Sequence, residues 1–478
     1  MRLRFCLLLL QALLVLSCST TPPEAPALHG TWESIGSGWL LQITDSTSYT
    51  FYDRSASACL PAREGALKEL ARSLSLQGDT LSLKKGVITY RFIRRKELPA
   101  PCGRPLSPEQ ARDPVLNFEV FAETIGTHYA FFEQNGIDWD SLYRAQRSKI
   151  GPQSDEADLY ALIEETQTLL HDNHASLEVP EEVEALLEED DTAAPEIASE
   201  EEELPEYGDF RVGDTVFYHH VQEDLTTDSW MLRWGKLSDT RGYIQVRAMW
   251  LYADLGVPQV LKEEGGYVAP YVQSYTQLYE GEYINKEVHS VAQVMDRVMQ
   301  DLSGMEDIVI DIRFNGGGQD AVAFEILSHF VPQTMQVATQ KLRDGEAYTA
   351  VLPLYITGTE EAYTKPVYVL TSPQTGSAAE AFALASMALP HIKRIGAPTL
   401  GAMSTALEKR LPNGWAYSLS NEVYMDNQGQ NYEYSGVPVD YTIAYPRERQ
   451  PFFRKVVNDM PADKEAILQA ITAVNARD

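Results

Sequence analysis

The chain has 478 residues and a formal net charge of −30, from 39 lysines and arginines against 69 aspartates and glutamates. A negative surplus of this size excludes nucleic acid and anionic membrane surfaces as electrostatic partners. No group of the four cysteines and nine histidines has the spacing of metal ligands, so neither a zinc ion nor another cofactor is expected.

The first 18 residues have the layout of an export signal. A short basic start precedes an apolar run, residues 6–16, that is too short to span a bilayer. The run ends in Val15-Leu-Ser-Cys18, which resembles the lipobox of bacterial lipoproteins, although Leu16 is large for its position. We therefore expect a protein of the cell envelope, anchored to the membrane through a lipid on Cys18. An ordinary secretory signal cleaved nearby is the alternative.

Residues 19–27 are rich in proline and are expected to form a tether. Residues 28–105 alternate β-type runs with turns and predict a small antiparallel barrel or sandwich, with strands at 39–43, 48–52, 81–83 and 87–92. Cys6 leaves with the signal and Cys18 would be the anchor, so Cys59 and Cys102 remain as a candidate disulfide. Such a bridge typically contributes about 2–4 kcal/mol by restricting the unfolded chain.

Residues 106–180 are helical in pattern, and an apolar stripe at three- and four-residue spacing predicts a buried helix face: Phe118, Phe121, Ile125, Tyr129 and Phe132. An acidic linker is expected at residues 181–209, because residues 181–206 include 13 acidic side chains and no basic one. Calcium binding is the less favoured alternative, since the run has no Asp-x-Asp-x-Asp-Gly pattern.

Residues 210–478 alternate strand and helix patterns and predict an α/β core. Two segments share one layout, in which an apolar strand ends in a loop. The first runs from Ile308 into three consecutive glycines at 316–318, which suit a backbone with positive φ. In the second, a strand at 367–370 and a turn lead to Ser377, where a helix begins. Amides of a new helix turn have no partner within the helix and could stabilise an oxyanion beside this serine.

The order Asp311-x-Arg-x-Asn-Gly-Gly-Gly318 and then Ser377-Ala-x-Glu380 resembles a serine peptidase family. The family contains the C-terminal processing proteases, the tricorn core protease and the interphotoreceptor retinoid-binding proteins. The resemblance extends over roughly residues 110–445. It implies a multi-domain α/β protein with a crotonase-like catalytic core and Ser377 as the nucleophile. It also implies an oxyanion hole built from the amides of Gly316, Gly317, Gly318 and Ala378.

Two further segments supply the other catalytic positions. Leu169-Leu-His-Asp-Asn-His-Ala-Ser-Leu177 resembles the family's histidine motif, whose register favours His174 over His171 as the general base. Tyr432-Glu-Tyr-Ser-Gly-Val-Pro-Val-Asp440 resembles the segment that completes the charge relay in the tricorn-like branch, which nominates Glu433. A solvated loop glutamate is the alternative for Glu433.

The chain also departs from the processing proteases, which use a Ser-Lys dyad. Ala402 stands where their lysine would stand, and Lys409 is the nearest substitute, in a different register. The tricorn branch has a serine directly before its histidine, whereas this chain has Asn173. No PDZ module is evident between the histidine segment and the nucleophile. The missing lysine and PDZ module favour a histidine triad over the Ser-Lys dyad, whereas Asn173 weakens the four-residue version of the tricorn relay without removing the triad.

The sequence thus predicts an exported, lipid-anchored serine peptidase that hydrolyses peptide or protein substrates through an acyl-enzyme, with a Ser377–His174–Glu433 relay. The alternative is a protein on the same scaffold that binds a peptide or an apolar ligand without turnover.

Overall fold

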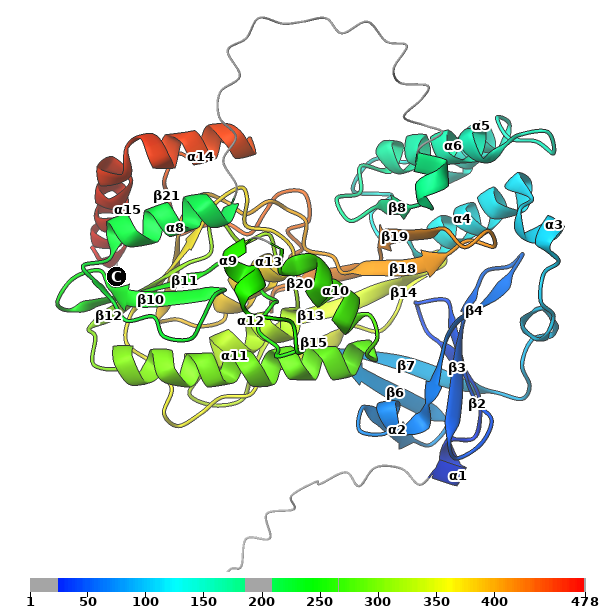
Figure 1. Cartoon of the computed structure of the whole chain (residues 1–478), viewed down its shortest axis with the longest axis horizontal. Coiled ribbons are helices and arrows are strands. Elements are labelled where there is room, and N and C mark those ends of the chain that lie inside the picture. The colour runs from blue at the N-terminus through cyan, green and yellow to red at the C-terminus, as the bar shows by residue number, and fades with distance from the viewer. Residues whose placement is uncertain (1–24, 185–208, 265, 477–478) are drawn as a thin grey trace, which may run out of the picture.

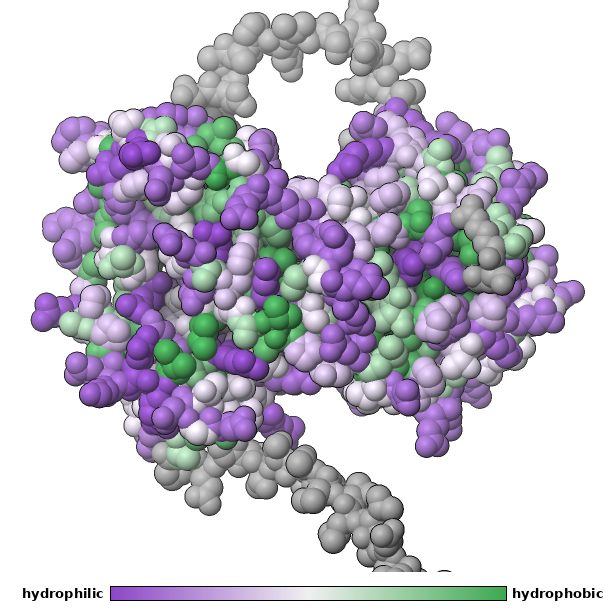
Figure 2. All heavy atoms as spheres, turned by 180° about the vertical axis from the view of Figure 1, so that it is seen from behind, coloured by the Kyte–Doolittle hydropathy of each residue, from purple (hydrophilic) through white to green (hydrophobic). Residues whose placement is uncertain are grey.

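The computed structural model describes residues 25–184, 209–264 and 266–476. The signal segment, Cys18, most of the tether and most of the acidic linker lie outside these residues. The described chain forms two lobes (Figure 1), and the view from behind shows them joined at a narrower waist with hydrophilic residues spread over both (Figure 2). In the described part of the chain, no helix combines the length and the apolar character needed to cross a membrane.

The N-terminal part is one antiparallel sheet with the strand order β4-β3-β2-β1-β7-β6-β5. Its strands alternate buried and more exposed residues, and the buried face centres on Trp32, which has no exposed surface. A disulfide joins Cys59 of β4 to Cys102 of the 3-10 helix η1. The elements are α1 (Ala25–Leu28), β1 (Gly30–Ser34), β2 (Trp39–Ile43), β3 (Ser48–Arg54), β4 (Cys59–Ala66), α2 (Leu67–Leu70), β5 (Leu74–Gln77), β6 (Thr80–Lys85), β7 (Ile88–Arg95) and η1 (Ala100–Gly103).

A helical segment follows, and all five residues of the predicted stripe are buried, but only Phe118, Phe121 and Ile125 lie on a helix, because that helix ends at His128 before Tyr129 and Phe132. Asp113 caps the helix that begins at Pro114 by accepting hydrogen bonds from the amides of Val115 and Leu116. His171 ends the last helix in the left-handed conformation, with φ of 54°. The elements are α3 (Pro108–Ala111), α4 (Pro114–His128), α5 (Trp139–Arg147), α6 (Glu156–Leu170) and β8 (Ser176–Glu178).

The helical segment is completed by a hairpin from much later in the chain, β18 (Ala406–Arg410) and β19 (Ala416–Ser420). β19 pairs with β8 in a three-stranded sheet of order β18-β19-β8. The ring of Tyr417 on β19 packs against Phe121 of α4, with centroids 5.3 Å apart. In Figure 1 the hairpin reaches across from the core to the helices. The peptidase-like part of the sequence therefore supplies part of the helical lobe's core.

The core lobe is built on a second seven-stranded sheet, of order β21-β17-β16-β12-β11-β10-β9. In this sheet β11, β12, β16, β17 and β21 run parallel to one another. β10 pairs antiparallel with β11, and β9 pairs antiparallel with β10. Ile308 and Ile310 of β12 pack against one helical layer, whereas Val309 faces the other, so the central strand is apolar on both faces. The strands are β9 (Glu223–Asp224), β10 (Leu232–Lys236), β11 (Arg241–Val246), β12 (Asp307–Asp311), β16 (Val367–Thr371), β17 (Ile392–Gly396) and β21 (Tyr441–Thr442).

Helices cover both faces of this sheet (Figure 1). The layer on one face contains α11 (Glu280–Leu302), α12 (Asp320–Ser328) and α13 (Ala378–Ser386), and that on the other contains α8 (Asp209–His220) and α15 (Met460–Asn475). A four-stranded sheet extends toward the second lobe. The remaining elements are α9 (Val260–Glu264), α10 (Val268–Tyr275), β13 (Met335–Asp344), β14 (Ala347–Tyr348), β15 (Leu352–Ile356), β20 (Glu422–Met425) and α14 (Arg449–Asn458). The predicted fold class, an N-terminal antiparallel sheet with helices and an α/β core, is confirmed.

Candidate active site

Ser377 stands at the sharp junction between β16 and α13, where the sequence predicts it. Its backbone has φ of 51° and ψ of −124°, a conformation that residues other than glycine rarely adopt. The side chain is half-buried, and its amide donates to the carbonyl oxygen of Ala402 at 2.9 Å. A strained serine held in this way at the start of a helix is presented at the carboxyl edge of the sheet.

The glycine loop lies directly against this serine. A Cβ atom added to Gly317 would come within 2.6 Å of the Cβ of Ser377, so a larger residue would displace the serine or the loop. Gly317 also has φ of 113°, which favours glycine. Asn315 fixes the loop, because its side chain accepts from the Gly317 amide at 2.9 Å and donates to the Val246 carbonyl at 3.0 Å. The structure thus brings together the two segments singled out in the sequence.

Three of the four amides predicted for an oxyanion hole are unengaged. Throughout the described ranges, no hydrogen bond uses the amide of Gly316, Gly318 or Ala378. The fourth, Gly317, donates to Asn315 and is not free. Free amides beside a serine hydroxyl are the donors that stabilise a tetrahedral oxyanion.

His174 approaches Ser377 from the other lobe, in the turn between α6 and β8. Its Nε2 atom lies 3.5 Å from the Oγ atom of Ser377. The turn is fixed by Asp172, whose carboxylate accepts from the His174 amide at 2.9 Å and from the amide and hydroxyl of Ser420 at 2.7 and 2.6 Å. Ser418 adds a hydrogen bond of 2.5 Å to the His174 carbonyl. The pairing of β8 with β19 therefore fixes the turn that carries His174, which meets Ser377 across 203 positions of sequence.

The surroundings of His174 favour the neutral imidazole. Burial lowers the pKa of His174 below its ordinary value of 6.5, and the nearby charge of Asp172 opposes this shift. A neutral imidazole at neutral pH can accept the serine proton on Nε2. The other ring nitrogen, Nδ1, is buried and has no hydrogen-bond partner in the part of the chain that is described.

Glu433 is buried, with 1% of its surface exposed, which argues against a solvated loop glutamate. Its Oε2 atom accepts from the amides of Met403 and Ser404 at 2.9 and 3.0 Å, while Oε1 has no partner among the described residues. No direct hydrogen bond joins Glu433 to His174 in those residues. Burial raises the pKa of Glu433 to about 8 against the opposing effect of the Met403 amide.

Glu380 is a structural element of the site to which the sequence reasoning gave no role. Its carboxylate has no exposed surface and accepts from Thr399, Gly401 and Ala402 at 2.6 to 2.7 Å, and from the Ser377 amide at 3.2 Å. It therefore fixes residues 399–402 against the nucleophile. The signal was present in the sequence, because a serine followed three residues later by glutamate is the pattern of a helix capping box.

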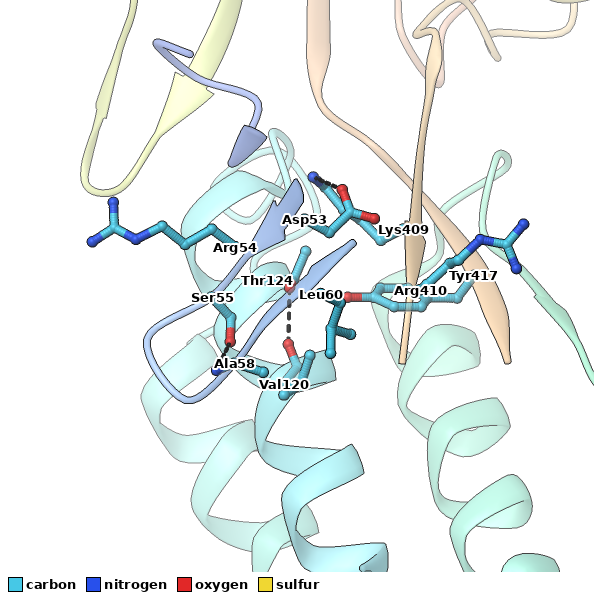
Figure 3. A pocket seen from close by; sticks show the side chains of 10 residues that line it. All are labelled: Asp53, Arg54, Ser55, Ala58, Leu60, Val120, Thr124, Lys409, Arg410 and Tyr417. Carbon is cyan, nitrogen blue, oxygen red and sulfur yellow. Dashed lines mark hydrogen bonds and ion pairs between the residues drawn. The ribbon is translucent and has the colours of Figure 1, made fainter. Parts of the chain in front are cut away.

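Three other residues from the sequence analysis, Lys409, His171 and Asn173, have other positions or partners. Lys409 is buried on β18, and its ammonium donates to Asp53 at 2.8 Å and to the Gly38 carbonyl at 3.3 Å, so it is committed to the N-terminal sheet (Figure 3). His171 is exposed at the end of α6. The Asn173 side chain donates to the Gly401 carbonyl at 3.3 Å, which links the histidine turn to residues 399–402.

The helix-covered α/β sheet thus presents Ser377 at its carboxyl edge, and a turn of the other lobe brings His174 to it, a pair of groups that suits acyl transfer. Residues 270–443 match the model of peptidase family S41, and this part of the chain is a domain of that family. The match includes the glycine loop, Ser377 and Glu433, whereas His174 precedes it.

Two solved structures share the fold. A candidate peptidase from Parabacteroides merdae superposes with a TM-score of 0.52 at 17% sequence identity, over 76% of this chain and 96% of that one. Mature CPAF superposes with a TM-score of 0.50 at 11% identity, over 76% of this chain and 98% of that one. At these identities the likeness concerns the fold alone.

Proposed function

We propose that this protein is a serine peptidase in which Ser377 is the nucleophile and His174 the general base. The observation that carries the proposal is the 3.5 Å approach of His174 Nε2 to Ser377 Oγ, beside the unengaged amide of Ala378. In structures without substrate, such contacts are often longer than in the reacting complex. A peptide carbonyl placed between these groups meets the hydroxyl and the oxyanion donors together.

The reaction proceeds by acyl transfer. Ser377 Oγ attacks the peptide carbonyl carbon as its proton passes to His174 Nε2, and the carbonyl oxygen becomes an oxyanion held by amides of Ala378 and the glycine loop. The protonated His174 then donates the proton to the leaving amine, and the C–N bond breaks. Water, deprotonated by His174, hydrolyses the acyl-enzyme and restores the serine hydroxyl.

Glu433 is proposed to complete the relay through Nδ1 of His174. Two unsatisfied buried atoms support this assignment, because Nδ1 of His174 lacks an acceptor and Oε1 of Glu433 lacks a donor among the described residues. Leaving both unpaired would cost on the order of 1–3 kcal/mol each. A proton on Nδ1 held by the Glu433 carboxylate keeps Nε2 free to accept from the serine.

The relay requires ionised Glu433 and neutral His174, which predicts a specific pH dependence. Burial raises the pKa of Glu433 to about 8, so its carboxyl holds a proton below that pH and loses it above. Burial lowers the pKa of His174 below 6.5, so the imidazole is protonated only at lower pH. We expect kcat/KM to rise with pH through a step near pH 8. In Glu433→Gln, this step should vanish and leave one step below pH 6.5. An identical profile in both proteins would contradict the role of Glu433.

The N-terminal sequence supports a location in the cell envelope, with a lipid on Cys18 as the anchor. We expect Cys18→Ser to move the exported protein from the membrane fraction to the soluble fraction, because the lipid would be its main source of membrane affinity. Fractionation followed by immunoblotting measures this, with Cys6→Ser as the matched control that keeps the anchor. Retention of Cys18→Ser in the membrane fraction would indicate attachment through the protein surface.

A further inference from the structure

A pocket outside the candidate active site is lined by residues of α8, α9 and α10 and by Trp230 and Arg247. It encloses about 540 Å³, within the range of ligand sites. Its aromatic lining comes from Phe210, Tyr218 and Trp230. No part of the peptidase mechanism uses these residues.

The charges of this pocket are opposite to those of the chain as a whole. Its lining contains three cations, Arg211, Arg247 and Lys262, and one carboxylate, Asp214, in a protein whose net charge is −30. Asp214 is already shared, because it pairs with Arg233 at 2.9 Å and with Arg247 at 3.3 Å. The pocket therefore has a local surplus of positive charge.

Arg247 gives the pocket a fixed donor. Its side chain is 4% exposed, lies over the Phe210 ring at 4.8 Å, and donates to the carbonyls of Trp230 and Phe210 at 3.1 and 3.0 Å. Its guanidinium is thereby held in the wall of the pocket, where its positive charge would attract a carboxylate.

Two more cations are available at the pocket. The Lys262 ammonium lies over the rings of Tyr267 and Trp230, at 4.7 and 5.5 Å, and no ion pair with a described side chain is formed by it or by Arg211. Arg211 is exposed, whereas Lys262 is half-buried. An anion that entered the pocket would meet these charges without breaking an existing ion pair.

The pocket is connected to the candidate active site through the backbone around Arg247. Arg247 lies between Val246, whose carbonyl accepts from Asn315, and Met249, whose amide donates to the Gly317 carbonyl at 2.8 Å. Both bonds connect the backbone on either side of Arg247 to the segment that carries the glycine loop beside Ser377. A peptide held at the active site could therefore extend along the same edge of the sheet.

We propose that this pocket binds a carboxylate of the peptide substrate, flanked by an apolar or aromatic residue. The cations and the aromatic rings indicate the chemistry of the ligand. That this ligand is part of a peptide rests on the proposed peptidase function. The carboxylate can come from an acidic side chain or from the end of the substrate chain, which present the same group to Arg247.

The test uses the full-length protein with Ser377→Ala, so that peptides bind without cleavage, and measures fluorescence anisotropy. Peptides of one apolar sequence differ only in a Glu-to-Gln change and in a free or amidated C-terminus. We expect the peptide with a carboxylate to bind roughly tenfold more weakly when Arg211→Gln and Lys262→Gln are added, with the uncharged, amidated peptide unaffected. Which carboxylate is needed identifies its source.

Lys68→Gln with Arg72→Gln, two exposed cations on α2 and in the turn that follows it, is the control with the same change in charge. Equal weakening by this control, or equal binding of charged and uncharged peptides, would overturn the proposal. Binding here does not depend on turnover, so a failure of the carboxylate site is distinguishable from a failure of the peptidase function. The latter is measured by hydrolysis of an uncharged peptide by the protein with Ser377 intact.

Discussion

Replacement of Ser377 by alanine is expected to abolish peptide hydrolysis, with a loss in kcat on the order of 10⁴-fold or more. The reason is chemical, because the substitution removes the one oxygen that lies 3.5 Å from His174 Nε2 and can form the acyl bond. The fold should persist, since none of the described hydrogen bonds that hold this junction uses the Ser377 hydroxyl except that contact. Hydrolysis of a fluorogenic peptide library, together with a thermal melt, measures both expectations.

Ser386→Ala is the matched control for this substitution. It makes the same change at the far end of α13, where the buried hydroxyl donates only to the Ala383 carbonyl at 2.6 Å. We expect a small loss of stability, about 1 kcal/mol, with kcat retained. If Ser377→Ala retained the parental rate, Ser377 would have no part in the mechanism.

His174→Ala is expected to lose nearly as much turnover as Ser377→Ala, because among the described residues no other base contacts the Ser377 hydroxyl. Glu433→Ala should lose less, since it removes an orienting and charge-balancing group and leaves the base in place. The measurement is kcat with a saturating peptide. Combining His174→Ala with Ser377→Ala should add little further loss, because the two residues act as a unit.

His171→Asn is the control for the histidine, because asparagine tolerates the left-handed conformation in which His171 ends α6. It should leave kcat nearly unchanged. Retention of full activity by His174→Ala would refute the histidine base. Lys409→Met should then be examined, although its ion pair with Asp53 makes loss of stability the expected effect.

The parts of the site that were predictable from sequence are those encoded by local pattern. The loop at 316–318 was predictable because three glycines follow an apolar strand. Ser377 was predictable because it precedes a helix-forming run, and both lie at the ends of the elements that the structure contains. The buried face of α4 and the strands β2, β3, β6 and β7 of the N-terminal sheet were predictable for the same reason, whereas β1, β4 and β5 were not predicted. Each depends on a periodicity of a few residues.

What could not be predicted depends on contacts between distant segments. The hairpin at 406–420 packs on helices that precede it by more than 230 positions, as the pair Asp172–Ser420 illustrates with a separation of 248. Register between such segments is set by the completed core, not by either sequence alone. The same holds for Lys409, whose partner Asp53 is 356 positions away. The engagement of the Gly317 amide by Asn315 depends on a side-chain geometry that the motif does not reveal.

The central claim, that Ser377 is a nucleophile activated by His174, is tested most directly by labelling with a fluorophosphonate. This reagent phosphonylates an activated serine, and peptide mapping by mass spectrometry locates the adduct. We expect a single adduct on Ser377 in the parent protein, none in Ser377→Ala, and strongly slowed labelling in His174→Ala at neutral pH. A folded parent protein that acquires no adduct, or acquires it on another residue, would contradict the account and favour a binding protein on the same scaffold.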